Sequence, residues 1–392
     1  MRSKLNLATV SLFLAVLLGF SVAFVLLPDN SFSEQENRGL RTFPAFSLEK
    51  LAYGRFGEEI NEYFADQFPL RDALVGIKGS VEIGLGKGEN DGILLGENGQ
   101  LAKRLFDVRR EDGSVTSVEL DAFDPAHIRN GAAGINRVSA SLSVPFTALL
   151  TGRTLDVAES AFAYPSETSD ALFEAFYNAL DPSVDAVDTL SMFRERYENG
   201  EYVYYKTDHH WTTLGAYYAY VELMRSWGME DQVLPMEAFE RETASDSFYG
   251  TAWSAGGMKF VAPDTMEFWM RGNEDDFTVT ADGKVLDGFY STKYLALKDK
   301  YSAFLDGTHD VVTVEKCAEE SRPTLLLLKD SFANAMAPFL AQHFDLVLLN
   351  LSSVRSDFTD VTRYAEEYNA DRVLLLYTIE NAVTADKLTR LR

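Results

Sequence analysis

Residues 324–340 read TLLLLKDSFANAMAPFL, a continuous apolar run followed at once by three polar residues. Such an aliphatic run is typical of a parallel strand that is buried on both faces. Residues 345–351 and 372–377 repeat this character, and residues 359–368 between them have the spacing of a helix. Strands and helices joined by short connections predict a parallel sheet with helices on both faces. In such sheets, functional residues gather at the carboxyl ends of the strands.

The rest of the chain also alternates between helix-like and strand-like segments. Helices are predicted over residues 48–68, 128–141, 167–180 and 214–227, and short strands over 93–95, 144–150 and 186–190. The polar residues 107–124 predict a surface excursion, and the glycine- and aromatic-rich residues 240–310 predict an irregular insertion. Together these segments predict an α/β fold, a three-layer domain over residues 29–392 with a mainly parallel sheet.

Composition excludes several classes of protein. The chain of 392 residues carries 36 Lys and Arg against 60 Asp and Glu, and the net charge of −24 argues against a nucleic-acid partner. Its hydrophobic content of 46% and charged content of 24% are ordinary globular values, which excludes a disordered or polytopic membrane protein. The single cysteine, Cys317, excludes an internal disulfide and a cysteine-rich zinc site.

The first 28 residues differ from the rest. Arg2 and Lys4 precede the uncharged segment Leu7–Leu27, which as a helix is long enough to cross a hydrocarbon core of about 30 Å. The flanking cations predict a cytoplasmic N-terminus and an exported domain. The alternative is a signal peptide that is cleaved to give a secreted protein, but the apolar run is long and ends without an A-x-A site. We therefore expect a single-pass anchor in the cell membrane with an extracytoplasmic domain.

One candidate for chemistry is Ser331, in the turn that follows the buried strand 324–328. A serine at such a turn faces the cleft above the sheet, where backbone N–H groups at the start of a helix, around Ser331 and Phe332, can hold an oxyanion. Pro338 predicts either the start of the regular helix or a kink in it. The simpler alternative is that Asp330 or Ser331 only caps the helix.

The second candidate is the segment TDHHWTT, residues 207–213. If it is extended, Asp208 and His210 project to the same side and His209 points away. A carboxylate that orients an imidazole makes that imidazole a general base for a hydroxyl group. Thr212 or Thr213 is expected to cap the helix that follows, and its N-terminus would keep His210 neutral. A metal site at the two histidines is a further alternative, which we do not favour because adjacent side chains diverge on an extended strand.

Asp208, His210 and Ser331 together supply the parts of a serine nucleophile, a base and an orienting carboxylate. Chain order is no objection, since such triads occur in several orders. The chain has no G-x-S-x-G, which disfavours an ordinary α/β-hydrolase elbow. We expect neither a metal nor a cofactor.

These motifs resemble those of a known family. TDHHWT resembles the signature of the DHHW protein family, and LLLLKDSFAN with the later PFL resembles its second signature. Similar pieces occur along most of the chain: SEQENRGLRTFP (33–44), YFADQFPLR (63–71), FYGTAWSAGG (248–257) and DKYSAFLDG (299–307). The family is related to the alginate O-acetylation proteins, whose domain resembles an SGNH hydrolase with its motifs permuted. Their D-x-H-W and D-S-F motifs imply the same Asp208, His210 and Ser331.

Residues that would contact the oxyanion or the substrate are harder to assign. Asn334, Tyr301 and the backbone near Gly250 are candidates for the oxyanion. Aromatic residues offer a surface on which sugar rings can stack, although core packing is the alternative for each of them. The candidates for that surface are Trp211, Trp253, Trp269, Tyr249 and Tyr290.

The resemblance implies an O-acyltransferase, with acetyl as the expected acyl group, or an esterase that acts on a cell-surface or extracellular polysaccharide. Its partners would be a glycan acceptor and a membrane-bound O-acyltransferase that donates the acyl group. The alternative is a catalytically silent protein that binds glycans or acts as a scaffold in their assembly at the cell envelope. In that case Asp208, His210 and Ser331 would form a structural hydrogen-bond network.

Overall fold

The computed structural model describes residues 2–33, 38–109, 115–123, 125–163, 167–317, 321–351, 359–384 and 387–392. The chain forms two compact units. The first comprises Met1–Lys87 with Gly257–Phe260, and the second comprises Gly88–Gly256 with Val261–Arg392. The division of the chain at residue 28 and the single domain over 29–392 remain predictions.

The first unit is mostly helical. Its helices are α1 (Arg2–Leu26), α2 (Leu48–Ala52), α3 (Arg55–Asp66) and α4 (Arg71–Gly84). Two short strands, β1 (Phe32–Ser33) and β2 (Arg38–Gly39), form an antiparallel pair. Within α1, residues Asn6–Leu26 are long and apolar enough to cross a membrane. The helix predicted over 48–68 is two helices, because Gly54 adopts a left-handed conformation (φ 76°) between them.

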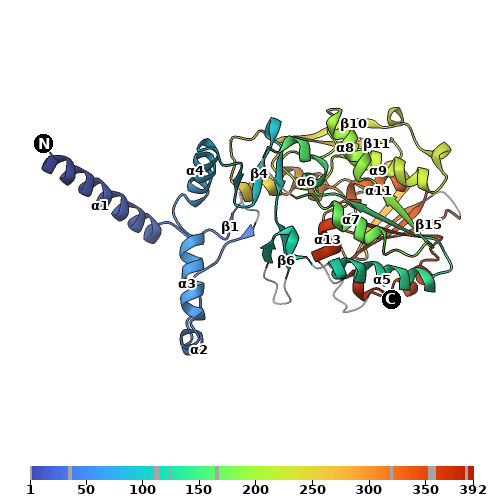
Figure 1. Ribbon diagram of the computed structural model, residues 1–392, viewed down its shortest axis with the longest axis horizontal. Coiled ribbons are helices and arrows are strands. Elements are labelled where there is room, and N and C mark those ends of the chain that lie inside the picture. The colour runs from blue at the N-terminus through green and yellow to red at the C-terminus, as the bar shows by residue number, and fades with distance from the viewer. Residues whose placement is uncertain are drawn as a thin grey trace. The chain divides into compact units, whose positions relative to one another are not determined.

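The second unit contains the predicted sheet (Figure 1). Its eight strands lie in the order β13-β12-β14-β16-β15-β17-β8-β9. Their bounds are β8 (Phe146–Thr151), β9 (Val184–Asp188), β12 (Phe277–Ala281), β13 (Lys284–Val285), β14 (Val311–Lys316), β15 (Thr324–Lys329), β16 (Asp345–Asn350) and β17 (Arg372–Thr378). The five strands from β16 to β9 are parallel, and β14, β12 and β13 extend them antiparallel. The mixed α/β fold with a mainly parallel sheet is therefore confirmed.

The central strands are buried on both faces, as their aliphatic runs require. Leu325–Leu328 of β15 and Leu374–Leu376 of β17 are completely inaccessible to solvent. Burying a leucine side chain stabilises the fold by about 1.5–3 kcal/mol, so this pair of strands anchors the core of the sheet. The turn that carries Ser331 therefore starts from the most rigid part of the unit.

Helices of the second unit pack in two groups. Helix α5 (Pro125–Ser141) contacts α7 (Asp170–Tyr177), α12 (Val361–Glu367) and α13 (Ile379–Thr384), whereas α9 (Thr213–Ser226) contacts α11 (Ala333–Leu340). Figure 1 shows α9 and α11 on one side of β15, and α5 and α13 on the other. The remaining α-helices of this unit are α6 (Thr154–Val157), α8 (Leu190–Glu198) and α10 (Thr251–Gly256).

Pro338 neither starts nor breaks its helix. Helix α11 begins at Ala333 and continues through Pro338 to Leu340, so the expected start at the proline is wrong, and a kink there stays a prediction. Proline removes one intrahelical hydrogen bond, in this case to the carbonyl group of Asn334. The helix tolerates this loss because every residue of α11 is buried against its neighbours.

The stretch 240–310 contains more regular structure than its composition indicates. Strands β10 (Glu240–Phe248) and β11 (Asp264–Met270) form an antiparallel pair, and β12 and β13 join the main sheet. Two further small sheets consist of β3 (Glu89–Asn90), β4 (Ile93–Leu95) and β5 (Leu101–Lys103), and of β6 (Phe106–Arg109) and β7 (Val115–Val118). The predicted surface excursion at 107–124 thus includes this β6–β7 hairpin, and residues 110–114 and 124 lie outside the described part of the chain.

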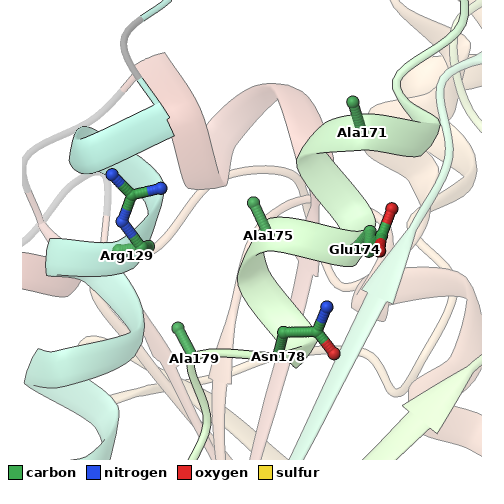
Figure 2. A pocket seen from close by; sticks show the side chains of 6 residues that line it. All are labelled: Arg129, Ala171, Glu174, Ala175, Asn178 and Ala179. Atoms are coloured by element: carbon green, nitrogen blue, oxygen red, sulfur yellow. The ribbon is translucent and has the colours of Figure 1, made fainter.

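An open hollow of about 410 Å³ lies between α5 and α7 (Figure 2). Its lining consists of Arg129, Ala171, Glu174, Ala175, Asn178 and Ala179. None of the predicted site residues lines it, and it offers neither a histidine nor a nucleophilic side chain. The candidate nucleophile Ser331 lies elsewhere, directly after the end of β15.

Candidate active site

The TDHHW segment forms a turn instead of the expected extended strand. Residues 206–210 bend, and the chain closes on itself through a bridge between Tyr204 and Trp211. The buried carboxylate of Asp264 holds the turn, because it accepts hydrogen bonds from the backbone N–H groups of Lys206 (2.8 Å) and Thr207 (2.7 Å). Thr212 then caps α9 by accepting a hydrogen bond from Gly215, as predicted.

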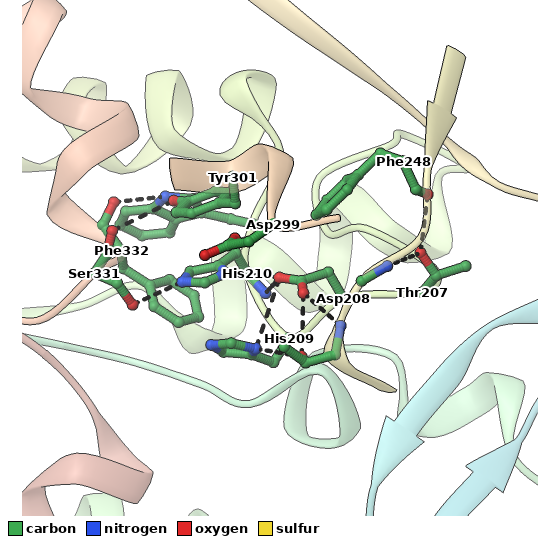
Figure 3. A network of polar contacts seen from close by, with 12 residues as sticks. Thr207, Asp208, His209, His210, Phe248, Asp299, Tyr301, Ser331 and Phe332 are labelled. Atoms are coloured by element: carbon green, nitrogen blue, oxygen red, sulfur yellow. Dashed lines mark hydrogen bonds and ion pairs between the residues drawn. The ribbon is translucent and has the colours of Figure 1, made fainter. Parts of the chain in front are cut away.

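This turn brings the three predicted residues into one hydrogen-bonded chain (Figure 3). The Nδ1 atom of His210 lies 2.6 Å from Asp208 Oδ1, and its Nε2 atom lies 2.7 Å from Ser331 Oγ. A carboxylate only accepts hydrogen bonds, so Nδ1 of His210 carries the proton and Nε2 accepts the hydroxyl proton of Ser331. That arrangement holds the imidazole in the tautomer that a general base requires.

Helix α10 fixes the second oxygen of Asp208. Its first residue, Thr251, donates both its backbone N–H (2.9 Å) and its hydroxyl group (3.1 Å) to Asp208 Oδ2. The residue before it must be glycine, because a Cβ atom at Gly250 would lie 2.2 Å from Asp208 Cβ. The backbone N–H of Gly250 donates to Thr207 Oγ1 (3.0 Å), so its expected role as an oxyanion donor is wrong.

His210 sits between aromatic rings. The Tyr301 ring stacks on it with a centroid separation of 3.6 Å and an angle of 10°, and the Phe332 ring lies 4.8 Å away. Burial lowers the pKa of His210 to about 4, which keeps the imidazole neutral at physiological pH. Tyr301 is itself buried and forms a wall of the site, with its hydroxyl group 3.5 Å from the Ser331 carbonyl oxygen; that it contacts the oxyanion or the substrate stays a prediction.

The turn after β15 leaves the Ser331 hydroxyl group free for His210. Neither Asp330 nor Ser331 caps α11, whose N-cap residue is Phe332 and which has no side-chain cap. Asp330 instead holds the turn: its Oδ1 accepts the backbone N–H of Phe332 (3.1 Å), and its Oδ2 accepts the backbone N–H of Thr378 (2.7 Å) and the side-chain amide of Asn381 (2.9 Å). The expected use of the Phe332 N–H as an oxyanion donor is therefore wrong. In the part of the chain that the structure describes, the Ser331 N–H has no hydrogen-bond partner and is the donor that remains.

Asn334 does not face the site. Its side chain is buried, accepts a hydrogen bond from Lys329 Nζ (2.6 Å) and donates to the carbonyl groups of Phe304 (3.5 Å) and Gly307 (3.2 Å). The prediction that it contacts the substrate or the oxyanion is wrong, since its polar atoms are already engaged. It instead ties the loop that carries Tyr301 to the helix that follows Ser331.

Two of the five residues of the predicted aromatic surface, Trp211 and Trp269, lie in the core. Trp211 is completely buried and donates its indole N–H to the carbonyl group of Phe332 (3.0 Å), so it cannot stack on a sugar. Trp269 is likewise buried, and Tyr290 donates its hydroxyl group to the Trp269 carbonyl group. Trp253, Tyr249 and Tyr290 are the candidates that are partly exposed, and the hydroxyl group of Tyr290 is engaged with the protein backbone.

His209 does not point away from the site. Its ring lies 3.9 Å from that of His210, and its Nδ1 atom lies 2.8 Å from Thr251 Oγ1 and 3.6 Å from Asp208 Oδ1. The bend at 206–210 causes this difference, because the alternation of an extended strand does not apply in a turn. Nearly half of the His209 side chain (48%) is exposed to solvent.

Comparison with known proteins identifies the family of this chain. A family model described as DHHW protein matches residues 152–350, just over half of the chain, and includes Asp208, His210 and Ser331. This chain belongs to the DHHW protein family. The resemblance of the TDHHWT and KDSF motifs to that family is thereby confirmed. Comparison with curated protein sequences finds no match.

Solved structures share the fold of this DHHW chain. A DHHW family protein from Eubacterium siraeum is 22% identical with a TM-score of 0.55, over 74% of this chain and 93% of that one. Bacillus cereus PatB1 with a sulfonyl adduct is 22% identical with a TM-score of 0.61, over 76% and 100%. The O-acetyltransferase domain of Pseudomonas putida AlgJ is 14% identical with a TM-score of 0.45, over 75% and 93%.

Proposed function

We propose that this protein is an O-acyltransferase, with acetyl as the acyl group, or an esterase, and that it acts on a cell-surface or extracellular polysaccharide. The observation that carries the proposal is the chain of two short hydrogen bonds from Asp208 through His210 to Ser331. Serine alone is a weak nucleophile, and it becomes reactive when an oriented base accepts its proton. Each contact lies within the range that such a base requires.

The reaction follows from the positions of these atoms. Ser331 Oγ attacks the carbonyl carbon of an acyl ester while its proton passes to His210 Nε2. Asp208 stabilises the imidazolium that forms, and the Ser331 N–H donates to the oxyanion. The leaving alcohol takes the proton from His210, which leaves an acyl group on Ser331. A sugar hydroxyl or a water molecule then attacks that acyl group, and His210 accepts its proton. The bond between the acyl group and Ser331 Oγ breaks, and His210 returns the proton to Oγ, which completes transfer or hydrolysis.

The comparison with Bacillus cereus PatB1 is consistent with such a nucleophile. That protein, which shares this fold, was determined with a sulfonyl adduct. Sulfonylation is a reaction of activated nucleophiles such as serine hydroxyl groups. The adduct belongs to PatB1, and for this chain it supports the proposal that Ser331 has the same reactivity.

Trp253 is the residue that we propose for contact with the acceptor sugar. It is partly exposed and lies 4.5 Å, between ring centroids, from the partly exposed Tyr249. The Lys298 ammonium group lies 4.3 Å from the Trp253 ring centre. Thr251, which donates a hydrogen bond to Asp208, lies between Tyr249 and Trp253 in the sequence. The two aromatic residues therefore flank a residue that supports the triad. Partly exposed aromatic faces of this kind suit the apolar faces of sugar rings.

We propose that α1 anchors the protein in the cell membrane and that the second unit is extracytoplasmic. The support is the length and apolar character of Asn6–Leu26 with cations before it. A membrane-bound O-acyltransferase is the donor that such a location favours.

The experiment that tests this function is turnover of a chromogenic acetyl ester by the full-length protein in detergent, with and without an oligosaccharide acceptor. We expect turnover that falls by at least about 10³-fold in the Ser331→Ala variant, because the triad acts as a unit. Acetylated oligosaccharide among the products would identify a transferase, and its absence an esterase. Equal turnover by wild type and Ser331→Ala would contradict the proposal and favour the glycan-binding alternative.

A further inference from the structure

The turn at 206–210 gathers three potential metal ligands that a straight strand would have separated. Asp208, His209 and His210 each offer one ligand atom, and these atoms all lie within 4.8 Å of one another. Asp208 Oδ1 lies at the centre of the set, 2.6 Å from His210 Nδ1 and 3.6 Å from His209 Nδ1. Two imidazole nitrogens and one carboxylate oxygen are a common zinc ligand set, with a fourth position left for water.

We propose that Asp208, His209 and His210 bind a zinc ion reversibly and that this ion switches the site off. Zinc bonds of about 2.0–2.2 Å in a tetrahedral arrangement place ligand atoms roughly 3.3–3.5 Å apart. The Asp208–His209 pair is already near that separation, and the Asp208–His210 pair would have to open by less than about 1 Å. The His209 side chain is 48% exposed, and to complete the site its Nδ1 atom would exchange the contact with Thr251 Oγ1 for the ion.

Zinc bound to Nδ1 of His210 would convert the imidazole from the tautomer with its proton on Nδ1 to the tautomer with its proton on Nε2. The neutral ring carries a single proton, which Nδ1 now donates to Asp208. When the ion takes the Nδ1 lone pair, that proton has to sit on Nε2. Nε2 then donates toward Ser331 Oγ and can no longer accept its proton, so the hydroxyl group loses its base. No proton is released, and no oxidation or reduction is involved.

The chemistry of the ligands favours zinc over magnesium. Imidazole suits Zn²⁺, whereas Mg²⁺ prefers oxygen ligands and keeps several water molecules. His209 is the residue on which the proposal turns, because the triad itself requires only Asp208 and His210. The relatives' D-x-H-W motif also leaves this position open. Inhibition rests on the proposed function, whereas binding of the ion does not.

The test measures zinc bound to the purified full-length protein by equilibrium dialysis with metal analysis, together with the effect of zinc on ester turnover. We expect one zinc ion per chain, no retention of Mg²⁺, and inhibition that a chelator reverses. The His209→Ala variant is expected to need at least roughly 10–100-fold more zinc for the same occupancy. His309→Ala is the matched control, because His309 also contacts carboxylates, Asp282 and Asp306, but lies outside this cluster.

Each outcome of this test decides one part of the proposal. Zinc that is not retained by wild type, or is retained equally by His209→Ala, would overturn the site. Loss of zinc in His309→Ala with retention in His209→Ala would place the ion elsewhere and also overturn it. Zinc that binds through His209 without slowing turnover would overturn the switch. A protein without ester turnover would contradict the proposed function, while the dialysis result would still decide the site.

Discussion

Replacement of Asp208 by asparagine is expected to lower ester turnover by about 10³–10⁴-fold, with the fold retained. The carboxylate accepts the Nδ1 proton of His210 at 2.6 Å and holds Nε2 ready for Ser331. An amide at position 208 can donate to Nδ1 and so favour the tautomer with its proton on Nε2, which cannot act as a base. It also removes the negative charge that stabilises the imidazolium. The measurement is kcat for a chromogenic acetyl ester, with circular dichroism as the check on folding.

The matched control is Asp185→Asn, which makes the same chemical change on the exposed side of β9. It should leave kcat unchanged, because Asp185 lies on β9, whereas the triad residues lie in the bend at 206–210 and in the turn after β15. A loss of less than about tenfold in Asp208→Asn would mean that Asp208 does not control the tautomer of His210.

Replacement of Gly250 by alanine is expected to lower turnover by about 100-fold or more although no triad residue is replaced. The new Cβ atom would lie 2.2 Å from Asp208 Cβ and 2.4 Å from Asp208 Oδ2, far inside contact distance. Either α10 or Asp208 must therefore move, and a displacement of about 1 Å at a catalytic group costs activity on this scale. Overpacking should also lower the free energy of unfolding by about 1–3 kcal/mol.

Gly84→Ala provides the control for this change, since a Cβ atom at Gly84 meets no atom within 4 Å. We expect that variant to keep wild-type turnover and stability. The measurements are kcat and the midpoint of chemical unfolding for both variants. Unchanged turnover in Gly250→Ala would show that the close approach of α10 to Asp208 is not needed for activity.

The sequence predicted the parts of the site that local patterns reveal. The strand before Ser331 is recognisable because four consecutive residues are leucine and the polar turn follows directly. Asp208 and His210 are recognisable as a spaced pair before a capped helix, and the structure brings both to Ser331. The pairing was nevertheless predicted for the wrong reason, since the segment is a bend. His209 was misplaced for the same reason.

The supports of the site could not be predicted, because each depends on a partner far away in the sequence. Asp264 lies 57 residues from Thr207, and Thr251 lies 43 residues from Asp208. Nothing in the local pattern around either residue specifies those contacts. One signal was present, because FYGTAWSAGG belongs to the family resemblance and contains both Gly250 and Thr251. Core packing, the alternative that the sequence left open for each aromatic residue, holds for Trp211 and Trp269; composition does not distinguish a core indole from an exposed one.

The central claim is that Ser331 is a nucleophile activated by His210, and a fluorophosphonate probe read by intact mass tests it most directly. Full-length wild type, Ser331→Ala and His210→Ala should be treated in parallel, each shown to be folded by circular dichroism. We predict a single label on wild type and none on either variant, because the probe reacts with an activated serine. Folded wild type that takes no label, or a Ser331→Ala variant that is labelled equally, would contradict the account.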